Sequence, residues 1–150
     1  MSRETPPDRE IVLLNPNRYA EAGTRRLLPW LDELVAAVAP QAASLGVRFV
    51  GDRAMRLTNR RFRAKDQTTD VLSFPGGDDG DGHLGDILIS VPAARRQAVE
   101  AGHAVDRELK ILLLHGILHC LGHDHETDQG EMERLERRLR KRWLATEATS

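Results

Sequence analysis

The most constraining feature of this chain is a nearly continuous apolar run, residues 111–121, which is interrupted by His115 and His119. Histidines four positions apart lie on one face of a helix, about one turn from each other, so both imidazoles can reach a single ion. The apolar residues surround them on almost every side, so we expect this helix at the centre of the core. A buried imidazole needs a partner for each ring nitrogen, and a metal ion would satisfy several of them together.

A third ligand has to be chosen between His123 and His125. On a continuous helix His123 would lie roughly 12 Å from His115, too far for one ion with zinc–nitrogen bonds of about 2.0–2.1 Å. Gly122 favours a left-handed residue that ends the helix and lets the chain turn back. We therefore predict that His115, His119 and His125 bind one ion. Three imidazoles suit zinc best, although nickel, copper and iron also accept them, and they leave one position open, as in catalytic sites.

The histidine spacing matches the H-E-x-x-H-x-x-G-x-x-H pattern of zinc peptidases at all positions but one. In those enzymes the glutamate after the first histidine acts as general base, whereas this chain has Gly116 there. Glu126 lies nearby, but its position does not recommend it as a replacement. Cys120 points about 100° away from His119 around the helix, so we interpret it as a small packed residue and not as a fourth ligand. Peptide hydrolysis is therefore the less favoured chemistry.

Composition bounds the class of protein. With 150 residues, 40% of them hydrophobic and 30% charged, the chain suits one soluble domain over residues 1–150. Its single cysteine excludes an internal disulfide and fits a reducing compartment. Residues 1–9 are polar and expected to be loosely ordered, without the apolar core of a signal peptide, and no apolar stretch approaches the ~20 residues of a membrane span. We expect a cytoplasmic protein, whose net charge of -1 gives no global attraction to nucleic acid.

Hydrophobic periodicity and turn residues predict short strands mixed with helices. Strands are expected over residues 11–14, 46–51, 69–74 and 84–90, and helices over 29–39, 53–63, 91–101, from about 105 through the histidines, and over 127–145. Asp52 is the expected N-cap of the second helix. The acidic glycine loop 76–82 lacks the ordered spacing of a calcium-binding EF-hand and is interpreted as a surface loop. The result is an α+β fold with a small mixed β-sheet of about four strands, packed with helices around a central buried helix that carries the histidines.

Positive charge is concentrated in two places. Arg60, Arg61, Arg63 and Lys65 follow one another closely, and their donors suit phosphate oxygens, although a solvated helix face is the alternative. A second run, residues 131–142, interleaves arginines and a lysine with glutamates. We interpret this second run mainly as i,i+4 pairing on an exposed helix.

Four segments carry a family resemblance. They are the histidine motif 115–125 with glycine at 116 and 122, the segment 63–75 (RAKDQTTDVLSFP), the triplet 85–87 (GDI) and the segment 131–136 (EMERLE). Together they resemble the YbeY family of bacterial rRNA maturation factors, over about residues 47–136. The chain departs from the family at His123, where tyrosine is usual, and at Cys120, where leucine is common. Neither departure removes a predicted ligand.

The resemblance implies a zinc-dependent endoribonuclease, specific for single-stranded RNA, that acts in rRNA 3′-end maturation and ribosome quality control. It implies one Zn2+ per chain on His115, His119 and His125, with Arg63 as the functional arginine facing the metal cleft. The implied partners are single-stranded RNA, rRNA above all, and the ribosome or its proteins, with neither DNA nor a membrane. The alternatives are a ribosome-assembly binding factor whose zinc is mainly structural and, third, a zinc metallopeptidase.

Several roles stay open at this point. Either water or the RNA 2′-hydroxyl can be the attacking group. His123 or Asp124 could transfer a proton, although Asp124 is more simply interpreted as a residue that orients a ligand histidine. Asp86 has a similar interpretation as a strand-end residue held by hydrogen bonds.

Overall fold

The strands and helices follow the predicted order along the chain. The computed structural model describes residues 9–15, 18–19, 24–63, 69–77, 82–123 and 129–144. Within them lie the strands β1 (Glu10–Leu14), β2 (Ser44–Val50), β3 (Val71–Pro75) and β4 (His83–Ser90), and the helices α1 (Leu27–Val38), α2 (Asp52–Arg63), α3 (Val91–Ala101), α4 (Val105–Cys120) and α5 (Glu131–Trp143), with a short 3-10 turn before α1. Residues 1–8, most of the acidic loop and the expected ends of the last helix at 127 and 145 lie outside the described residues.

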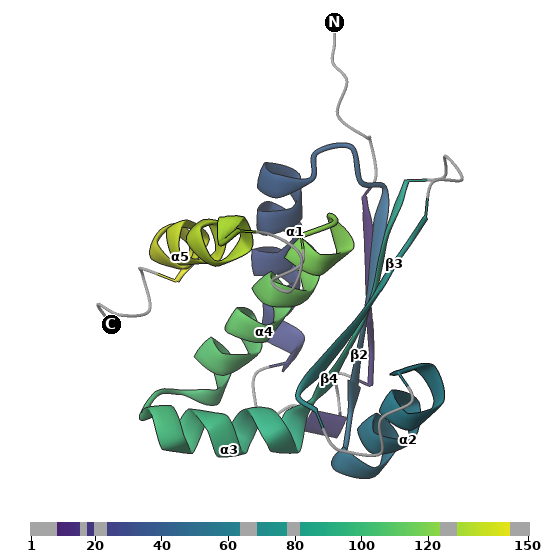
Figure 1. Cartoon of the computed structure of the whole chain (residues 1–150), viewed down its shortest axis with the longest axis vertical. Helices are drawn as coiled ribbons and strands as arrows, with labels where there is room; N and C mark the ends of the chain where they lie inside the picture. Colours follow the sequence, from purple (N-terminus) through teal and green to yellow (C-terminus); the bar gives the residue numbers. More distant parts are fainter. Residues whose placement is uncertain are drawn as a thin grey trace, which may run out of the picture.

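The four strands form one mixed sheet in the order β1-β2-β4-β3, which confirms the predicted α+β fold (Figure 1). β1 and β4 both run parallel to β2, whereas β3 runs antiparallel to β4 and forms an edge of the sheet. Parallel neighbours need crossover connections, and the helices between the strands supply them. In Figure 1 the sheet is seen nearly edge-on, with α1, α3, α4 and α5 on one side and α2 on the other.

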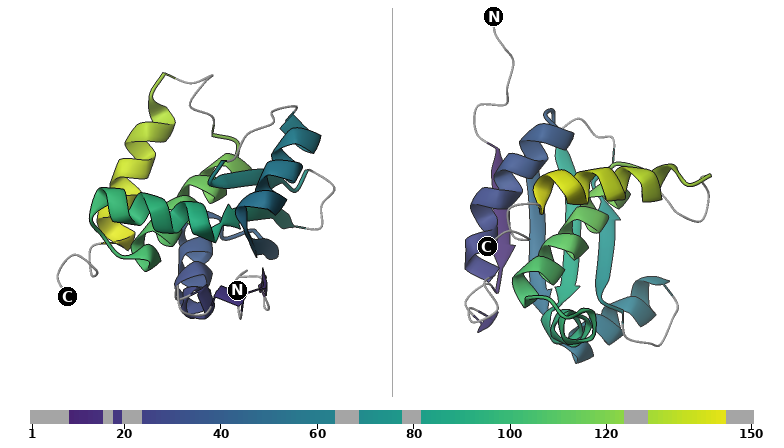
Figure 2. Two further views of the ribbon diagram at one scale, coloured as in Figure 1. Left: turned by 90° about the horizontal axis from the view of Figure 1, so that it is seen from below. Right: turned by 90° about the vertical axis from the view of Figure 1, so that its left-hand side faces the viewer.

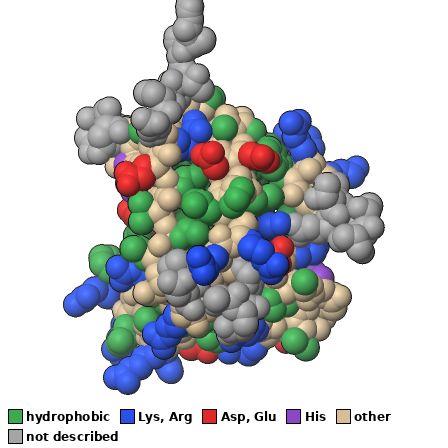
Figure 3. All heavy atoms as spheres, turned by 180° about the vertical axis from the view of Figure 1, so that it is seen from behind, with side chains coloured by type: hydrophobic (Ala, Val, Ile, Leu, Met, Phe, Trp, Pro, Cys, Tyr) green, Lys and Arg blue, Asp and Glu red, His purple; other side chains and the backbone are tan. Residues whose placement is uncertain are grey.

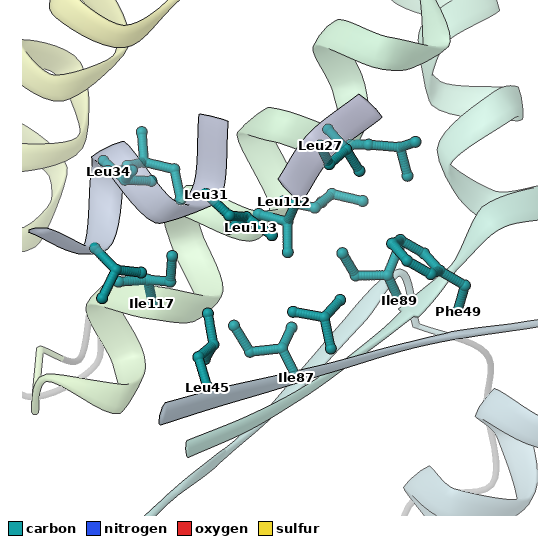
Figure 4. Packing of buried hydrophobic residues seen from close by; sticks show 14 of the residues in the cluster. Leu27, Leu31, Leu34, Leu45, Phe49, Ile87, Ile89, Leu112, Leu113 and Ile117 are labelled. Atoms are coloured by element: carbon teal, nitrogen blue, oxygen red, sulfur yellow. The ribbon is translucent and has the colours of Figure 1, made fainter. Parts of the chain in front are cut away.

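The helix-covered side of the sheet holds the main core. Side chains in a strand alternate between the two faces, and the inward set of β2 and β4 is apolar. Figure 4 shows how these residues fill the space between the sheet and the helices; the labelled ones are Leu27, Leu31, Leu34, Leu45, Phe49, Ile87, Ile89, Leu112, Leu113 and Ile117. The helix with the histidines is therefore the central buried one, as predicted.

The opposite side of the sheet holds a smaller apolar cluster under α2. Val50, Met55 and Leu72 are buried there, and Phe74 and Leu88 pack against them. The apolar residues of α2 were not all inward: Met55 is buried, whereas Leu57 and Phe62 are exposed. This helix has little apolar surface to bury, because most of its side chains are charged or polar.

The start of α2 is held by α3. Asp52 is the first residue of the helix, and its carboxylate accepts hydrogen bonds from the Ser90 hydroxyl at 3.0 Å and from both terminal nitrogens of Arg96 at 2.9 and 3.1 Å. The hydrogen bonds to Arg96 lower the pKa of Asp52 below its ordinary value, against the opposing effect of burial. Ser90 also caps α3, because its hydroxyl accepts from the backbone N–H of Ala93.

Among the helices of the described chain, none has the length and apolar character needed to cross a membrane.

Candidate metal centre on α4

Two histidines of α4 face each other across one turn of the helix. The Nε2 atoms of His115 and His119 are 3.0 Å apart, and the ring centroids are 4.6 Å apart with an interplanar angle of 70°. Tetrahedral zinc with bonds of about 2.0–2.1 Å would hold two nitrogens about 3.3 Å apart. The observed spacing is close to that value, so the pair fits a shared ion with little movement.

A buried carboxylate contacts the second ring nitrogen of the first of these histidines. Glu136 of α5 is 7% exposed, and it accepts a hydrogen bond from Nδ1 of His115 at 2.8 Å. An acceptor at this position keeps the proton on Nδ1 and leaves the Nε2 lone pair for another partner. Metal-bound histidines usually donate their second N–H to a carboxylate or a carbonyl in this way. The His115 and His119 imidazoles, with Glu136 bound to the second nitrogen of His115, are therefore chemically suited to Zn2+.

Glu136 was missed as a site residue by the sequence analysis, which interpreted its helix as an exposed row of i,i+4 pairs. One such pair is present, Glu133 with Arg137 at 3.4 Å, and both of these side chains are 68% exposed. Glu136 instead shares the inward face of α5 with Met132, one turn earlier. A glutamate on the same helical stripe as a buried methionine was the signal that could have found it.

The end of α4 has the predicted geometry. Gly122 has φ +100, in the left-handed region, its N–H donates to the carbonyl of His119, and the N–H of His123 donates to the carbonyl of Leu118. These two bonds form a Schellman motif, which stops the helix and turns the chain away from its axis. The predicted third ligand, His125, and Asp124 lie outside the described residues. Within the described part of the chain no group of three His, Cys, Asp or Glu side chains is arranged to hold a metal.

Gly116 lies where α4 packs most closely against the sheet. A Cβ atom at this position would meet Cδ1 of Ile87 and Oγ of Ser73, each at 3.0 Å. A glutamate at this position, as zinc peptidases carry after the first histidine, would therefore require Ile87 and Ser73 to shift. The close packing between α4, β3 and β4 disfavours that general base here.

Cys120 and Asp86 lie on the sheet side of α4. The thiol packs against the main core and close to Gly85, and burial, with a contribution from Asp86, raises the pKa of Cys120 to about 12. A protonated, packed thiol agrees with the interpretation of Cys120 as a small structural residue. Asp86 lies within β4, and its carboxylate accepts from Nε2 of His83 at 3.1 Å.

Arg63 is the last residue of α2, and the structure describes its backbone but not its side chain. Lys65 lies outside the described residues. Arg60 and Arg61 are exposed on α2. The structure therefore brings together His115 and His119 of the predicted site and leaves its other members unplaced.

The mixed sheet with a histidine pair and a buried glutamate on its covering helices defines an α+β protein with a candidate metal centre. The family model described as Endoribonuclease YbeY matches residues 15–144. The chain belongs to the YbeY family, which confirms the resemblance seen in its motifs.

Two relatives agree with this assignment, and one solved structure shares the fold. The Endoribonuclease YbeY of Solibacter usitatus is 57% identical over 90 residues, 60% of this chain and 59% of that protein. The Endoribonuclease YbeY of Geobacillus thermodenitrificans is 41% identical over 124 residues, 72% of this chain and 80% of that protein. A solution structure of a Thermotoga maritima protein shares the fold with a TM-score of 0.66 at 24% identity, over 93% of this chain and 92% of that one. The chain thus spans less than two thirds of the length of the Solibacter relative.

Proposed function

We propose that this protein is a zinc-dependent endoribonuclease that cleaves single-stranded RNA in the cytoplasm, with rRNA 3′-end maturation and ribosome quality control as its setting. The observation that carries the proposal is the convergence of the His115 and His119 Nε2 atoms, 3.0 Å apart, with Glu136 behind the first ring. Membership of a family whose relatives are named endoribonucleases supports RNA as the substrate. The proposed ligands are His115, His119 and His125.

The residues around the pair have separable roles in this proposal. Glu136 fixes the tautomer and the orientation of His115, so that its Nε2 lone pair faces that of His119. Gly116 brings α4 against the sheet and so holds both imidazoles on a rigid support. Arg63 neutralises charge that develops on the phosphate during cleavage. A bound Zn2+ would supply a Lewis acid and a water of lowered pKa.

The packing at Gly116 supports nuclease over peptidase chemistry. A peptidase of this motif needs a carboxylate directly after the first histidine, and Ile87 and Ser73 lie so close to Gly116 that they would have to shift to admit one. A phosphodiester carries a negative charge that the arginines of α2 can attract, whereas a neutral peptide bond does not. The arginine-rich helix therefore favours the RNA substrate.

The proposal is tested by measuring bound zinc and cleavage of a single-stranded RNA on the same preparations. His119→Ala is expected to lose zinc and at least about 100-fold in cleavage rate, since removing one ligand of a catalytic metal removes most of its chemistry. Arg63→Ala is expected to keep its zinc and lose most cleavage. His103→Gln is the matched control: His103 pairs with Glu108 at the α3–α4 junction, and glutamine can keep that hydrogen bond.

Equal cleavage by His119→Ala and wild type would contradict the proposal. Stoichiometric zinc without turnover in the wild-type protein would favour the ribosome-assembly factor instead. Because metal binding can supply folding energy, each variant is also checked by circular dichroism. A folded His119→Ala protein without zinc separates loss of chemistry from loss of structure.

A further inference from the structure

α2 is unusual among the helices of this molecule in its charge. It carries five arginines, at positions 53, 56, 60, 61 and 63, and its single carboxylate is Asp52, at its first residue. That carboxylate is already engaged by Arg96 of α3. α2 therefore has no second carboxylate among its own residues, whereas α5 carries the exposed Glu131 and Glu133 in its first turn, and Glu133 pairs with Arg137. Figure 3 shows Lys and Arg side chains gathered at the lower left of the rear view, where α2 lies.

An exposed aromatic ring lies at the end of this basic helix. Phe62 is 63% exposed, and its ring contacts that of Phe74 of β3 edge to face, with centroids 5.4 Å apart and an interplanar angle of 71°. The contact to Phe74 fixes the ring against the sheet while most of its surface faces solvent. An aromatic ring held in this way offers an exposed face on which a nucleic-acid base can stack.

The helix geometry relates this ring to the arginines. Phe62 lies on the side of α2 that carries the buried Met55 and Asn59, but it is far more exposed than either of them. Arg60 projects from the opposite side, and Arg61 lies between the two. Arg60 and Arg61 also line a shallow hollow with Leu57 and Thr58. A chain that crosses the end of α2 can therefore contact the ring and then the guanidinium groups in turn.

We propose that the C-terminal half of α2 is a binding surface for single-stranded RNA, in which one base stacks on Phe62 while the adjacent phosphates bind Arg61 and Arg60. The inference rests on the proposed function and adds to it the residues that hold the RNA outside the metal centre. Charge complementarity selects the occupant, because a polyanion with flat bases matches arginines beside an exposed ring.

Figure 1 shows α2 and α4 on opposite sides of the sheet, and in the right panel of Figure 2 α4 lies in front of the strands. Both helices contact the edge strand β3, because Phe62 packs on Phe74 and Gly116 lies against Ser73. An RNA held on α2 would therefore reach the histidines around the β3 edge of the sheet.

The test measures equilibrium binding of the protein to a fluorescein-labelled oligouridine of about 12 nucleotides, within the site sizes common for single-strand binding. Phe62→Leu is expected to weaken binding about tenfold, because leucine keeps an apolar side chain but offers no ring for a base. Phe62→Tyr keeps the ring and is expected to bind as wild type does. An unchanged affinity of Phe62→Leu would overturn the proposal and leave this surface to a protein partner.

The arginines are tested by the salt dependence of the same binding. Arg60→Gln/Arg61→Gln is expected to lower the slope of log K against log salt concentration by about 1.4, or about 0.7 for each phosphate contact on a single strand. Arg138→Gln/Lys141→Gln on α5 removes the same charge from two exposed positions and is expected to leave the slope unchanged. If the slope falls equally in the two double variants, the effect comes from net charge alone, and the proposal is overturned. If Phe62→Leu unfolds, Phe62→Tyr and the two charge pairs still decide the outcome.

The RNA from each sample is then sized on a gel, which separates this proposal from the proposed function. Intact RNA in all samples, together with the expected losses of affinity, supports the surface and contradicts cleavage. Cleavage by the wild type with equal affinities of all variants contradicts the surface and leaves the endonuclease standing.

Discussion

The two faces of the sheet differ in how firmly they are covered. On one face α1, α3 and α4 bury a continuous apolar core, and α4 approaches the strands so closely that a Cβ at Gly116 would meet Ile87 and Ser73 at 3.0 Å. On the other face α2 covers a small cluster around Met55, and much of this helix stays in water. The rigid face holds the histidine pair within a few tenths of an ångström of the geometry that the proposed metal centre requires. The open face leaves arginines and Phe62 exposed, as the proposed RNA surface requires.

The comparison predicts unequal costs for the same kind of core truncation. Leu113→Ala removes a fully buried side chain between α1, α4 and the sheet, and we expect it to lower the free energy of unfolding by about 4 kcal/mol. Met55→Ala is expected to cost about 2 kcal/mol, because α2 can settle into the space that the shorter side chain leaves. Urea unfolding measures both values, provided that the slope of the transition is unchanged. Equal costs would show that the two faces are equally rigid.

A substitution at Gly116 measures the closeness of α4 to the sheet directly. Alanine in a helix interior is usually about 1 kcal/mol better than glycine. Here the added methyl group meets Ile87 and Ser73 at 3.0 Å, so we expect Gly116→Ala to destabilise the protein by about 2 kcal/mol. The double variant Gly116→Ala/Ile87→Val removes one of the contacting atoms and should recover part of that loss relative to the sum of the two single changes. Strict additivity in urea unfolding would mean that Ile87 is not the obstacle.

A substitution of Glu136 tests whether its contact with His115 strengthens metal binding. Glu136→Gln is expected to weaken Zn2+ binding about tenfold, because a neutral amide is a poorer partner for Nδ1 of His115 than a carboxylate is. Glu133→Gln, at an exposed position on the same helix, is the matched control. Competition with a chromogenic chelator measures both affinities. Indistinguishable values for the two variants would assign Glu136 a role in folding alone.

Most of the fold could be predicted from the sequence because its signals are local. The alternation of apolar residues in β2 and β4, and the apolar stripe of α4 followed by Gly122, each depend on a few neighbouring residues. Gly122 adopts the expected left-handed backbone and ends α4. The inward side of α2 was harder to predict, because Asn59 is buried there while Leu57 and Phe62 are exposed. Tertiary packing, and not helix periodicity, decides which face of so polar a helix is covered.

The candidate site could be predicted only where its residues lie on one helix. His115 and His119 are four positions apart, so their convergence follows from helix geometry. Glu136 reaches His115 from α5, and no local pattern links residues 21 positions apart. The buried position of Glu136 in this charged helix can be predicted only if Met132 is first used to locate the inward face. The contact between α4 and α5 is thus the part of the site that needs the fold.

The smallest expected effect concerns the ion pair between Asp52 of α2 and Arg96 of α3. Arg96 lowers the pKa of Asp52, so the folded state favours the ionised carboxylate more than the unfolded chain does. The resulting stability is present above the ordinary pKa of about 3.8 and is lost as the pH falls through the lowered value in the folded protein. Arg96→Gln should therefore be slightly less stable than wild type at pH 7, and this difference should vanish in acid. Both partners are substantially exposed, at 58% and 40%, so solvent screens the pair and the difference is small. Urea unfolding of both proteins at pH 7 and pH 3 measures how this difference in stability changes with pH. Arg138→Gln is the charge-matched control. A difference that persists unchanged at pH 3 would assign Arg96 a packing role instead of an electrostatic one.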